Sequence, residues 1–100
     1  MTSAKIIGNL TKDIEIEVSA SGTKYAHFTV ASDRSKSDDS KTDFFRISAI
    51  GDWIEDLRDL RKGTFVTVNA TLKTGEYEGR QAVEIVAKKV ERFIAKEKAA

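Results

Sequence analysis

The sequence contains no cysteine and no proline, and it has a single histidine, His27. Without cysteine the chain cannot form a disulfide, use a thiolate nucleophile or build a Cys-based metal site. One histidine excludes a histidine cluster that binds a metal, and the lack of proline argues against a proline-rich linker. We therefore expect no cofactor and no bound metal, and the composition fits a reducing compartment.

The chain also has no large excess of charge of either sign, because 17 Lys and Arg residues are balanced by 16 Asp and Glu residues, which gives a net charge of +1. A polycation that holds nucleic acid by bulk charge is thus excluded, and any anion site must come from local placement of charge. No segment approaches the ~20 apolar residues that span a bilayer. The apolar run near the N-terminus is too short for a secretory signal. We expect a soluble cytoplasmic protein with no membrane partner.

What is present is a chain of 100 residues, the size of one domain. Alternating apolar and polar residues predict β-strands, and one stretch at helical spacing predicts a short helix over residues 52–62, with Asp52 as N-cap and Gly63 at C′. Residues 33–42 and 74–79 are predicted loops. The predicted strands are residues 4–10 and 13–18 (two pieces that can form one strand bent near Gly8), 25–32, 43–50, 64–73 and 80–93.

The predicted order β-β-β-α-β-β is that of the OB-fold, an all-β, five-stranded Greek-key barrel with one short helix between strands three and four. We expect this domain to occupy residues 1–93, followed by a short polar extension, residues 94–100. The strand 2–3 face and the 1–2 and 4–5 loops of such barrels bind oligonucleotides or oligosaccharides.

The third predicted strand carries the first candidate binding residues. Phe44, Arg46 and Ile50 lie at even spacing on the face opposite Phe45, Ile47 and Ala49. An exposed aromatic ring next to a guanidinium can stack a base and hold its phosphate. The alternative is that Phe44 packs under a loop or in a subunit contact, with Arg46 merely solvated.

Tyr77 lies in the glycine-flanked 4–5 hairpin, where a large aromatic side chain rarely serves the core. It is a candidate second stacking residue, or it folds back on its own hairpin. Lys73 and Arg80 flank the hairpin and are candidate phosphate contacts, although Glu76 and Glu78 weaken a purely electrostatic interpretation.

Other basic residues are weaker candidates. Arg34 and Lys36 lie in the acidic 33–42 loop, and Lys5 lies next to the first strand, so each can contact phosphate or be ordinary surface. His27 lies on the face opposite Phe28; it can contact nucleic acid on the same sheet face as Phe44, but it is interpreted as a lone surface or hydrogen-bonded histidine. Trp53 lies on the helical stripe and is expected in the core or partly buried.

No catalytic motif is present. The sequence has no nucleophile–His–acid set, no P-loop, no dinucleotide fingerprint and no EF-hand loop. Its carboxylate pairs lie in loops or on polar faces, where nothing separates their pKa values. We therefore expect a protein that is not an enzyme.

Several short motifs in register resemble bacterial-type single-stranded-DNA-binding proteins. The stretch Ile6-Ile7-Gly8-Asn9-Leu10-Thr11-Lys12-Asp13 is similar to the opening IGNL-x-x-D strand of that family. Further similarity follows at Ser21-Gly22 with residues 26–31, at Thr42-Asp43-Phe44-Phe45-Arg46 with Gly51, and at Leu60-Arg61-Lys62-Gly63 with Val66 and Val68. The match covers nearly the whole chain in order.

The resemblance implies an OB-fold that binds single-stranded DNA without sequence preference as a homo-oligomer, normally a tetramer. Phe44 falls where the family has a stacking tryptophan, Tyr77 where it has a hairpin aromatic, and Arg46, Lys5, Lys62 and Lys73 on basic positions. The chain departs from the family at Ile50, where a phenylalanine is common, and in the 2–3 loop, where Arg34, Ser35 and Lys36 replace an aromatic. Fewer stacking groups imply weaker binding per subunit.

The family also carries a flexible tail ending in acidic and aromatic residues that recruits replication and repair proteins. This sequence stops at Lys96-Glu97-Lys98-Ala99-Ala100 without one, so it resembles either a truncated chain or a tailless plasmid, phage or divergent form. The main prediction is binding and protection of single-stranded DNA in replication, recombination or repair, in the cytoplasm or in a host cytoplasm. The alternatives are a tailless primosome-type module that also binds partner proteins, and an RNA-binding OB domain.

Overall fold

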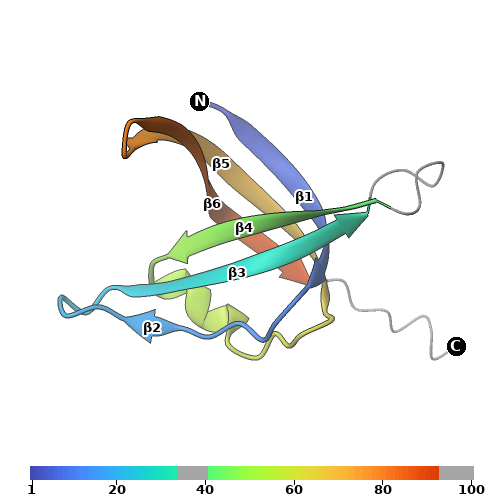
Figure 1. The fold of residues 1–100 in the computed structure, drawn as a ribbon. Coiled ribbons are helices and arrows are strands. Elements are labelled where there is room, and N and C mark those ends of the chain that lie inside the picture. The colour runs from blue at the N-terminus through green and yellow to red at the C-terminus, as the bar shows by residue number, and fades with distance from the viewer. Residues whose placement is uncertain (34–40, 93–100) are drawn as a thin grey trace, which may run out of the picture.

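The computed structural model describes residues 1–33 and 41–92, and six strands make up most of them. The predicted 33–42 loop and the 94–100 extension therefore lie largely outside the described residues. The elements are β1 (Ser3–Leu10), β2 (Glu17–Val18), β3 (Lys24–Asp33), β4 (Thr42–Ile50), the 3₁₀ helix η2 (Asp52–Leu57), β5 (Phe65–Tyr77) and β6 (Arg80–Arg92) (Figure 1).

The strands wrap around into a barrel. β1 pairs antiparallel with β5 along most of its length and with β3 through Asn9 and Leu10 at its end. β3 pairs with β4, and β5 with β6, also antiparallel. The barrel is completed between β4 and β6 by a single parallel pair, Ser48 with Val86, so its closure is loose at this seam. This is the predicted OB-fold topology.

The core is apolar throughout the described residues, and no buried residue among them is polar or charged. Each strand except β2, whose two residues are both exposed, contributes residues from one face, as the alternation of the sequence predicted. From β4, Ile47 and Ala49 are buried, and Phe45 packs against the core from its edge. The buried set is Ile6, Leu10, Ile14, Ala26, Phe28, Val30, Ile47, Ala49, Ile54, Leu57, Leu60, Val66, Val68, Ala70 and Ala87.

The predicted short helix between strands three and four is confirmed, but it is a 3₁₀ helix and is shorter than the predicted residues 52–62. η2 is a 3₁₀ helix that ends at Leu57, and Gly51, with φ 118°, replaces the predicted N-cap Asp52. Its buried residues Ile54 and Leu57 are three positions apart, which matches a helix with three residues per turn, and Leu60 in the turn after η2 continues the same spacing. These three are buried, whereas Trp53 lies off their stripe and is exposed at 36%, so the expected place of Trp53 in the core is wrong.

The predicted strand 13–18 is also wrong, since only Glu17–Val18 forms a strand. The segment before it is held by contacts outside the sheet. The Ile14 N–H donates to the Leu60 carbonyl at 3.1 Å, and an Asp13 carboxylate oxygen accepts from the Lys62 N–H at 2.7 Å. Alternation here therefore reflects packing of Ile14 against the turn after η2 rather than a strand ladder.

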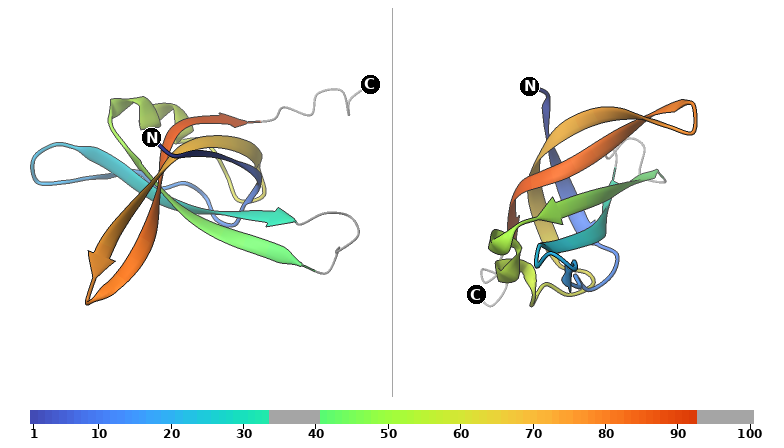
Figure 2. Two further views of the ribbon diagram at one scale, coloured as in Figure 1. Left: turned by 90° about the horizontal axis from the view of Figure 1, so that it is seen from above. Right: turned by 90° about the vertical axis from the view of Figure 1, so that its left-hand side faces the viewer.

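The predicted 74–79 loop is in fact a two-residue turn. β5 and β6 stay paired out to Tyr77 and Arg80, and Glu78 (φ 52°) and Gly79 (φ 79°) make the turn between them. Positive φ at both central residues is the signature of a type I′ hairpin turn. The result is a long ribbon that projects from the barrel to the same side as β3 and β4 (Figures 1 and 2).

Within residues 1–33 and 41–92, no helix is long and apolar enough to cross a membrane. Nor does this part of the chain bring together three or more His, Asp or Glu side chains in a way that could hold a metal ion.

Candidate nucleic-acid interface

The outer face of β3 and β4 is an exposed sheet surface that carries three of the predicted binding residues. Because β3 and β4 pair antiparallel over nine residue pairs, their outward side chains form five cross-strand pairs. From one end to the other these pairs are Asp33–Thr42, Ala31–Phe44, Thr29–Arg46, His27–Ser48 and Tyr25–Ile50. Phe44, Arg46 and Ile50 thus share one face, as predicted.

Both apolar candidates on this face are open to solvent. The Phe44 side chain is 66% exposed and that of Ile50 is 51% exposed. The opposite partner of Phe44 is the small residue Ala31, which leaves the ring uncovered from β3. Within the described residues Phe44 does not pack under a loop, so the structure favours an exposed ring over the first part of the alternative.

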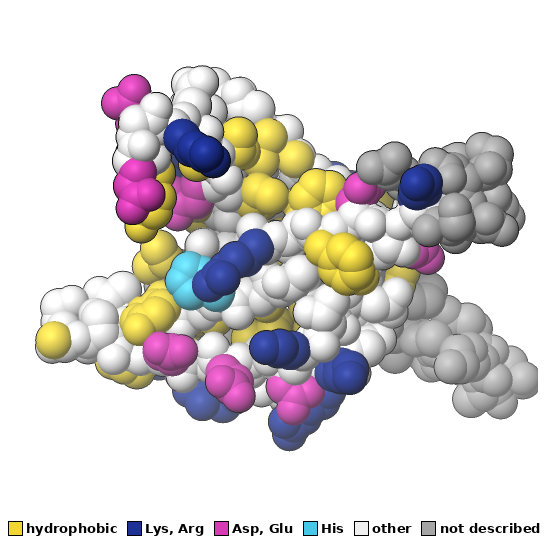
Figure 3. Space-filling model, viewed as in Figure 1, with side chains coloured by type: hydrophobic (Ala, Val, Ile, Leu, Met, Phe, Trp, Pro, Cys, Tyr) yellow, Lys and Arg dark blue, Asp and Glu magenta, His cyan; other side chains and the backbone are white. Residues whose placement is uncertain are grey.

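A groove of about 610 Å³ runs next to this face. Arg46 and Lys62, two of the predicted site residues, both line it, although 16 positions separate them in the chain (62 − 46). Figure 3 shows basic and acidic side chains alternating along the edge of this side of the molecule. The full lining is Thr11, Lys12, Asp13, Glu15, Glu17, His27, Phe28, Thr29, Arg46 and Lys62.

The acidic and basic side chains of the groove differ in how they are engaged. Asp13 is in an ion pair with Arg61 at 3.6 Å and accepts the Lys62 N–H, and Glu17 accepts the hydroxyl of Tyr25 at 2.9 Å. By contrast, the side chains of Lys12, Arg46 and Lys62 have no ion pair or hydrogen bond with any described residue. The cations are therefore the groups available to an incoming anion, while two of the three carboxylates are partly satisfied.

Tyr25 is half-buried and held in place. The Tyr25 hydroxyl donates a hydrogen bond to the carboxylate of Glu17, the residue directly opposite Tyr25 in the β2–β3 ladder. That hydrogen bond, together with the negative charge of Glu17, raises the pKa of Tyr25.

The β5–β6 ribbon carries Tyr77, Lys73 and Arg80. Tyr77 is 77% exposed and pairs with Arg80 at the end of the ribbon, so it lies beside the turn and away from the core. Lys73 faces Glu84 and, with Tyr77, lines a second hollow of about 410 Å³ on the ribbon. These three residues lie together but apart from the groove.

The remaining predicted residues do not gather at one place. Lys5 lies on β1 opposite Asn69 of β5 and belongs neither to the groove nor to the β3–β4 face. Arg34 and Lys36 lie outside the described residues. The structure adds Lys12 and Tyr25, which sequence reasoning did not select as site residues. Lys12 lies inside the IGNL-x-x-D motif, but only the fold shows that it lines the groove. Tyr25 alternates with His27 in the sequence, but only the strand register shows that it lies opposite Ile50.

A small Greek-key barrel with an exposed aromatic side chain on one strand, and beside it a groove lined by cations that have no partner among the described residues, defines an OB-fold binding module. The model of the single-strand binding protein family matches residues 1–93 of this chain. The chain belongs to the single-strand binding protein family, and it is a non-enzymatic member of it.

Similar proteins with curated names carry the name of the same family. The chain is 38% identical over 88 residues to the single-stranded DNA-binding proteins of Paenarthrobacter aurescens and Paenarthrobacter nicotinovorans, covering 80% of this chain and 52% of each relative. The single-stranded DNA-binding protein of Clostridium perfringens is 37% identical over 82 residues, with 80% and 54% covered. The chain spans about half the length of the curated relatives it matches.

The fold is also similar to a solved structure. A crystal structure of a deletion mutant of the single-stranded DNA binding protein from Thermus aquaticus matches with a TM-score of 0.76 at 22% identity, over 94% of this chain and 42% of that one. At this identity the likeness supports the OB-fold itself.

Proposed function

We propose that this protein binds single-stranded DNA without sequence preference and protects it during replication, recombination or repair. The observation that carries the proposal is that the exposed ring of Phe44 lies on the same strand face as the guanidinium of Arg46, two residues further on, which has no partner among the described residues. The names of the curated relatives point to the same ligand.

Such a site would work by stacking and by charge. A base stacks on the ring of Phe44, and this contact tolerates any sequence because every base has a π-face. Arg46, Lys12 and Lys62 then contact the phosphates along the groove and release counterions. The carboxylates of the groove limit how much phosphate the site attracts, which agrees with a net charge of only +1.

The β5–β6 ribbon would supply a second contact. It projects to the side on which the β3–β4 face lies, with Tyr77 exposed near its end. We propose that Tyr77 stacks on a base while Lys73 and Arg80 hold the backbone. Lys5 on β1 and the predicted contacts Arg34 and Lys36 would extend the path of the strand.

We propose that the protein acts as a homo-oligomer, with a tetramer as the expected state. Ile7 of β1 and Phe65 of β5 are exposed and lie diagonally across one β1–β5 face, where a second copy could cover them. Linking several weak sites raises the overall affinity for a long strand by avidity. Native mass spectrometry with and without oligo(dT) measures the oligomer and the stoichiometry together.

Acting on DNA, the protein would work in the cytoplasm, and contacts with replication or repair proteins would be secondary to DNA binding. A pull-down performed with and without DNA separates this function from that of a protein-interaction module. Competition between DNA and RNA strands of one sequence separates it from RNA binding. The primary test is a titration with oligo(dT), in which absence of saturable binding at low salt contradicts the proposal.

A further inference from the structure

We infer that Tyr25, His27 and Ile50 form a second base-binding subsite, at the opposite end of the β3–β4 face from Phe44. The inference rests on the proposed function and adds to it where the DNA strand continues. It assigns a binding role to Tyr25, which the sequence did not select, and to His27, for which a nucleic-acid contact was only the weaker alternative.

The first support is the register of the two strands. Tyr25 lies directly opposite Ile50, so an aromatic ring on β3 and an exposed aliphatic side chain on β4 form one cross-strand apolar pair. Ile50 is the position at which the resemblance leads one to expect an aromatic side chain. The cross-strand partner places a ring next to that position instead.

The second support is the arrangement of the aromatic rings. The rings of Tyr25 and His27 are 6.1 Å apart between centroids and meet at 67°. They therefore form a corner instead of stacking on each other. His27 is exposed, and its Nδ1 lies 3.1 Å from the Ser48 hydroxyl, whereas no described residue is hydrogen-bonded to Nε2. A base in this corner can contact a ring face and use the remaining imidazole nitrogen.

The third support is that the corner is held before any ligand arrives. The Tyr25 hydroxyl donates a hydrogen bond to the Glu17 carboxylate, and the Nδ1 atom of His27 is hydrogen-bonded to the Ser48 hydroxyl. Each ring therefore already has a partner that orients it before DNA binds. Immobilising side chains is one of the main costs of binding, and groups that are already fixed avoid it.

Charge favours a base over a phosphate at this corner. The Glu17 carboxylate next to Tyr25 repels phosphate, whereas an uncharged base is not repelled. The phosphates would instead follow Arg46 and the groove cations Lys12 and Lys62, which have no partner among the described residues. Figure 3 shows the histidine in the middle of this side of the molecule, with a basic side chain against it and hydrophobic side chains nearby.

The subsite is separate from that of Phe44. Six residue steps along β4 separate Phe44 from Ile50, which at ~3.3 Å per residue is about 20 Å. One base cannot occupy both places, so the corner lengthens the footprint of a strand on this face. OB-folds cover about 4–16 nucleotides, which is compatible with two stacking points on one face.

The test compares two substitutions at one position. Tyr25→Leu removes the ring, and Tyr25→Phe keeps the ring but removes the hydrogen bond to Glu17. Binding of oligo(dT) of about 15 nucleotides is measured for both and for the wild-type protein, together with thermal unfolding. We expect Tyr25→Leu to weaken binding by roughly fivefold or more, and Tyr25→Phe to stay within about twofold of wild type.

A second measurement does not depend on the variants folding. The wild-type protein is irradiated with oligo(dT) containing 5-iodouracil, and the cross-linked peptides are identified by mass spectrometry. Cross-links at Tyr25 or His27 in addition to Phe44 support the subsite. Cross-links at Phe44 alone, or unchanged affinity of a folded Tyr25→Leu protein, overturn the subsite and leave the proposed function standing. If the wild-type protein fails to bind oligo(dT) at low salt, the proposed function fails and the subsite with it.

Discussion

Gly8 of β1 and Ala31 of β3 meet where the two strands cross, and the Ala31 carbonyl group occupies the space that a side chain at position 8 would need. A Cβ there would also lie 2.9 Å from Val30 Cγ1. The contact lets β1 pair with β5 along one edge and with β3 at its end, which brings the two halves of the barrel together. The glycine is thus required by close backbone approach.

Substituting this glycine should destabilise the fold. We expect Gly8→Ala to lower the free energy of unfolding by about 1–3 kcal/mol or more, since the overlap is with backbone that cannot rotate away. Chemical denaturation measures the change. Gly75→Ala is the matched control, because nothing lies within 4 Å of a Cβ built at Gly75. Equal stability of the two variants would show that β1 and β3 do not cross as described.

The salt dependence of DNA binding should identify which cations contact phosphate. Each phosphate contact contributes about −0.7 to the slope of log K against log salt for a single strand. We expect Arg46→Gln to make the slope shallower by roughly that amount, because Arg46 has no partner among the described residues. Arg58→Gln is the control, since the guanidinium of Arg58 is already bound to Glu55 at 2.7 Å. If both variants keep the wild-type slope, Arg46 does not contact phosphate.

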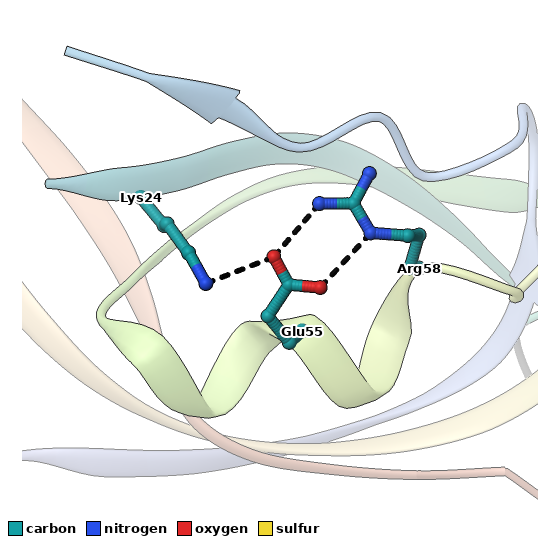
Figure 4. Close-up of polar contacts among 3 residues, drawn as sticks. All are labelled: Lys24, Glu55 and Arg58. Carbon is teal, nitrogen blue, oxygen red and sulfur yellow. Dashed lines mark hydrogen bonds and ion pairs between the residues drawn. The ribbon is translucent and has the colours of Figure 1, made fainter. Parts of the chain in front are cut away.

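Glu55 links η2 to β3 through charge. Its carboxylate contacts Lys24 Nζ at 3.0 Å and accepts two hydrogen bonds from Arg58, at 2.9 and 2.7 Å (Figure 4). The hydrogen bonds from Arg58 and then Lys24 lower the pKa of Glu55 from 4.5 to about 2. Since the folded-state pKa is below the unfolded one, the stabilisation is present above pH 4.5 and is lost as the pH falls towards 2.

Replacing this carboxylate should flatten the acid limb of the stability curve. We expect Glu55→Gln to show a smaller drop in stability between pH 4.5 and 2 than the wild-type protein, and the effect should be modest because the pair is exposed. Thermal unfolding across this pH range provides the measurement. Asp56→Asn, at an exposed neighbour, serves as the control. An identical pH dependence in Glu55→Gln and wild type would mean that the ion pairs do not persist in solution.

The tight turn of the β5–β6 ribbon carries a non-glycine residue at positive φ, Glu78 at 52°. Asparagine adopts this conformation at lower cost than glutamate. We therefore expect Glu78→Asn to slow amide hydrogen exchange near Tyr77 and Arg80, with Glu76→Asn, in the strand, as control. Faster exchange in Glu78→Asn than in wild type would contradict a type I′ turn here.

The buried and exposed faces of a strand could be predicted from the sequence where the strand is paired with other barrel strands on both sides. On β4, alternation correctly separated the buried residues Ile47 and Ala49 from the exposed Phe44 and Ile50. Alternation misled at Ile14 and Ile16, because Ile14 packs on a turn and its N–H pairs with the Leu60 carbonyl. A period of two alone does not reveal whether the hydrogen-bond partner is a strand or a turn.

The site was predictable in its residue types and less so in its assembly. Phe44, Arg46 and Ile50 were found because they share one strand and one face. The approach of Lys12 and Lys62 to Arg46 and the pairing of Tyr25 with Ile50 depend on chain crossings and register, which short-range patterns do not encode. The spacing of Ile54 and Leu57 in η2, continued by Leu60 after it, fits a 3₁₀ helix, but a period of three is close enough to 3.6 to be mistaken for an α-helix.

The measurement that most directly tests the central claim is a titration of wild type and Phe44→Ala with oligo(dT) at two salt concentrations. Because Phe44 is 66% exposed, its removal should leave thermal unfolding nearly unchanged. We predict saturable wild-type binding that weakens with salt, and a loss of about 1–3 kcal/mol of binding free energy in Phe44→Ala. No saturable binding at low salt, or equal affinity of the two proteins, would contradict a DNA-binding face built on Phe44.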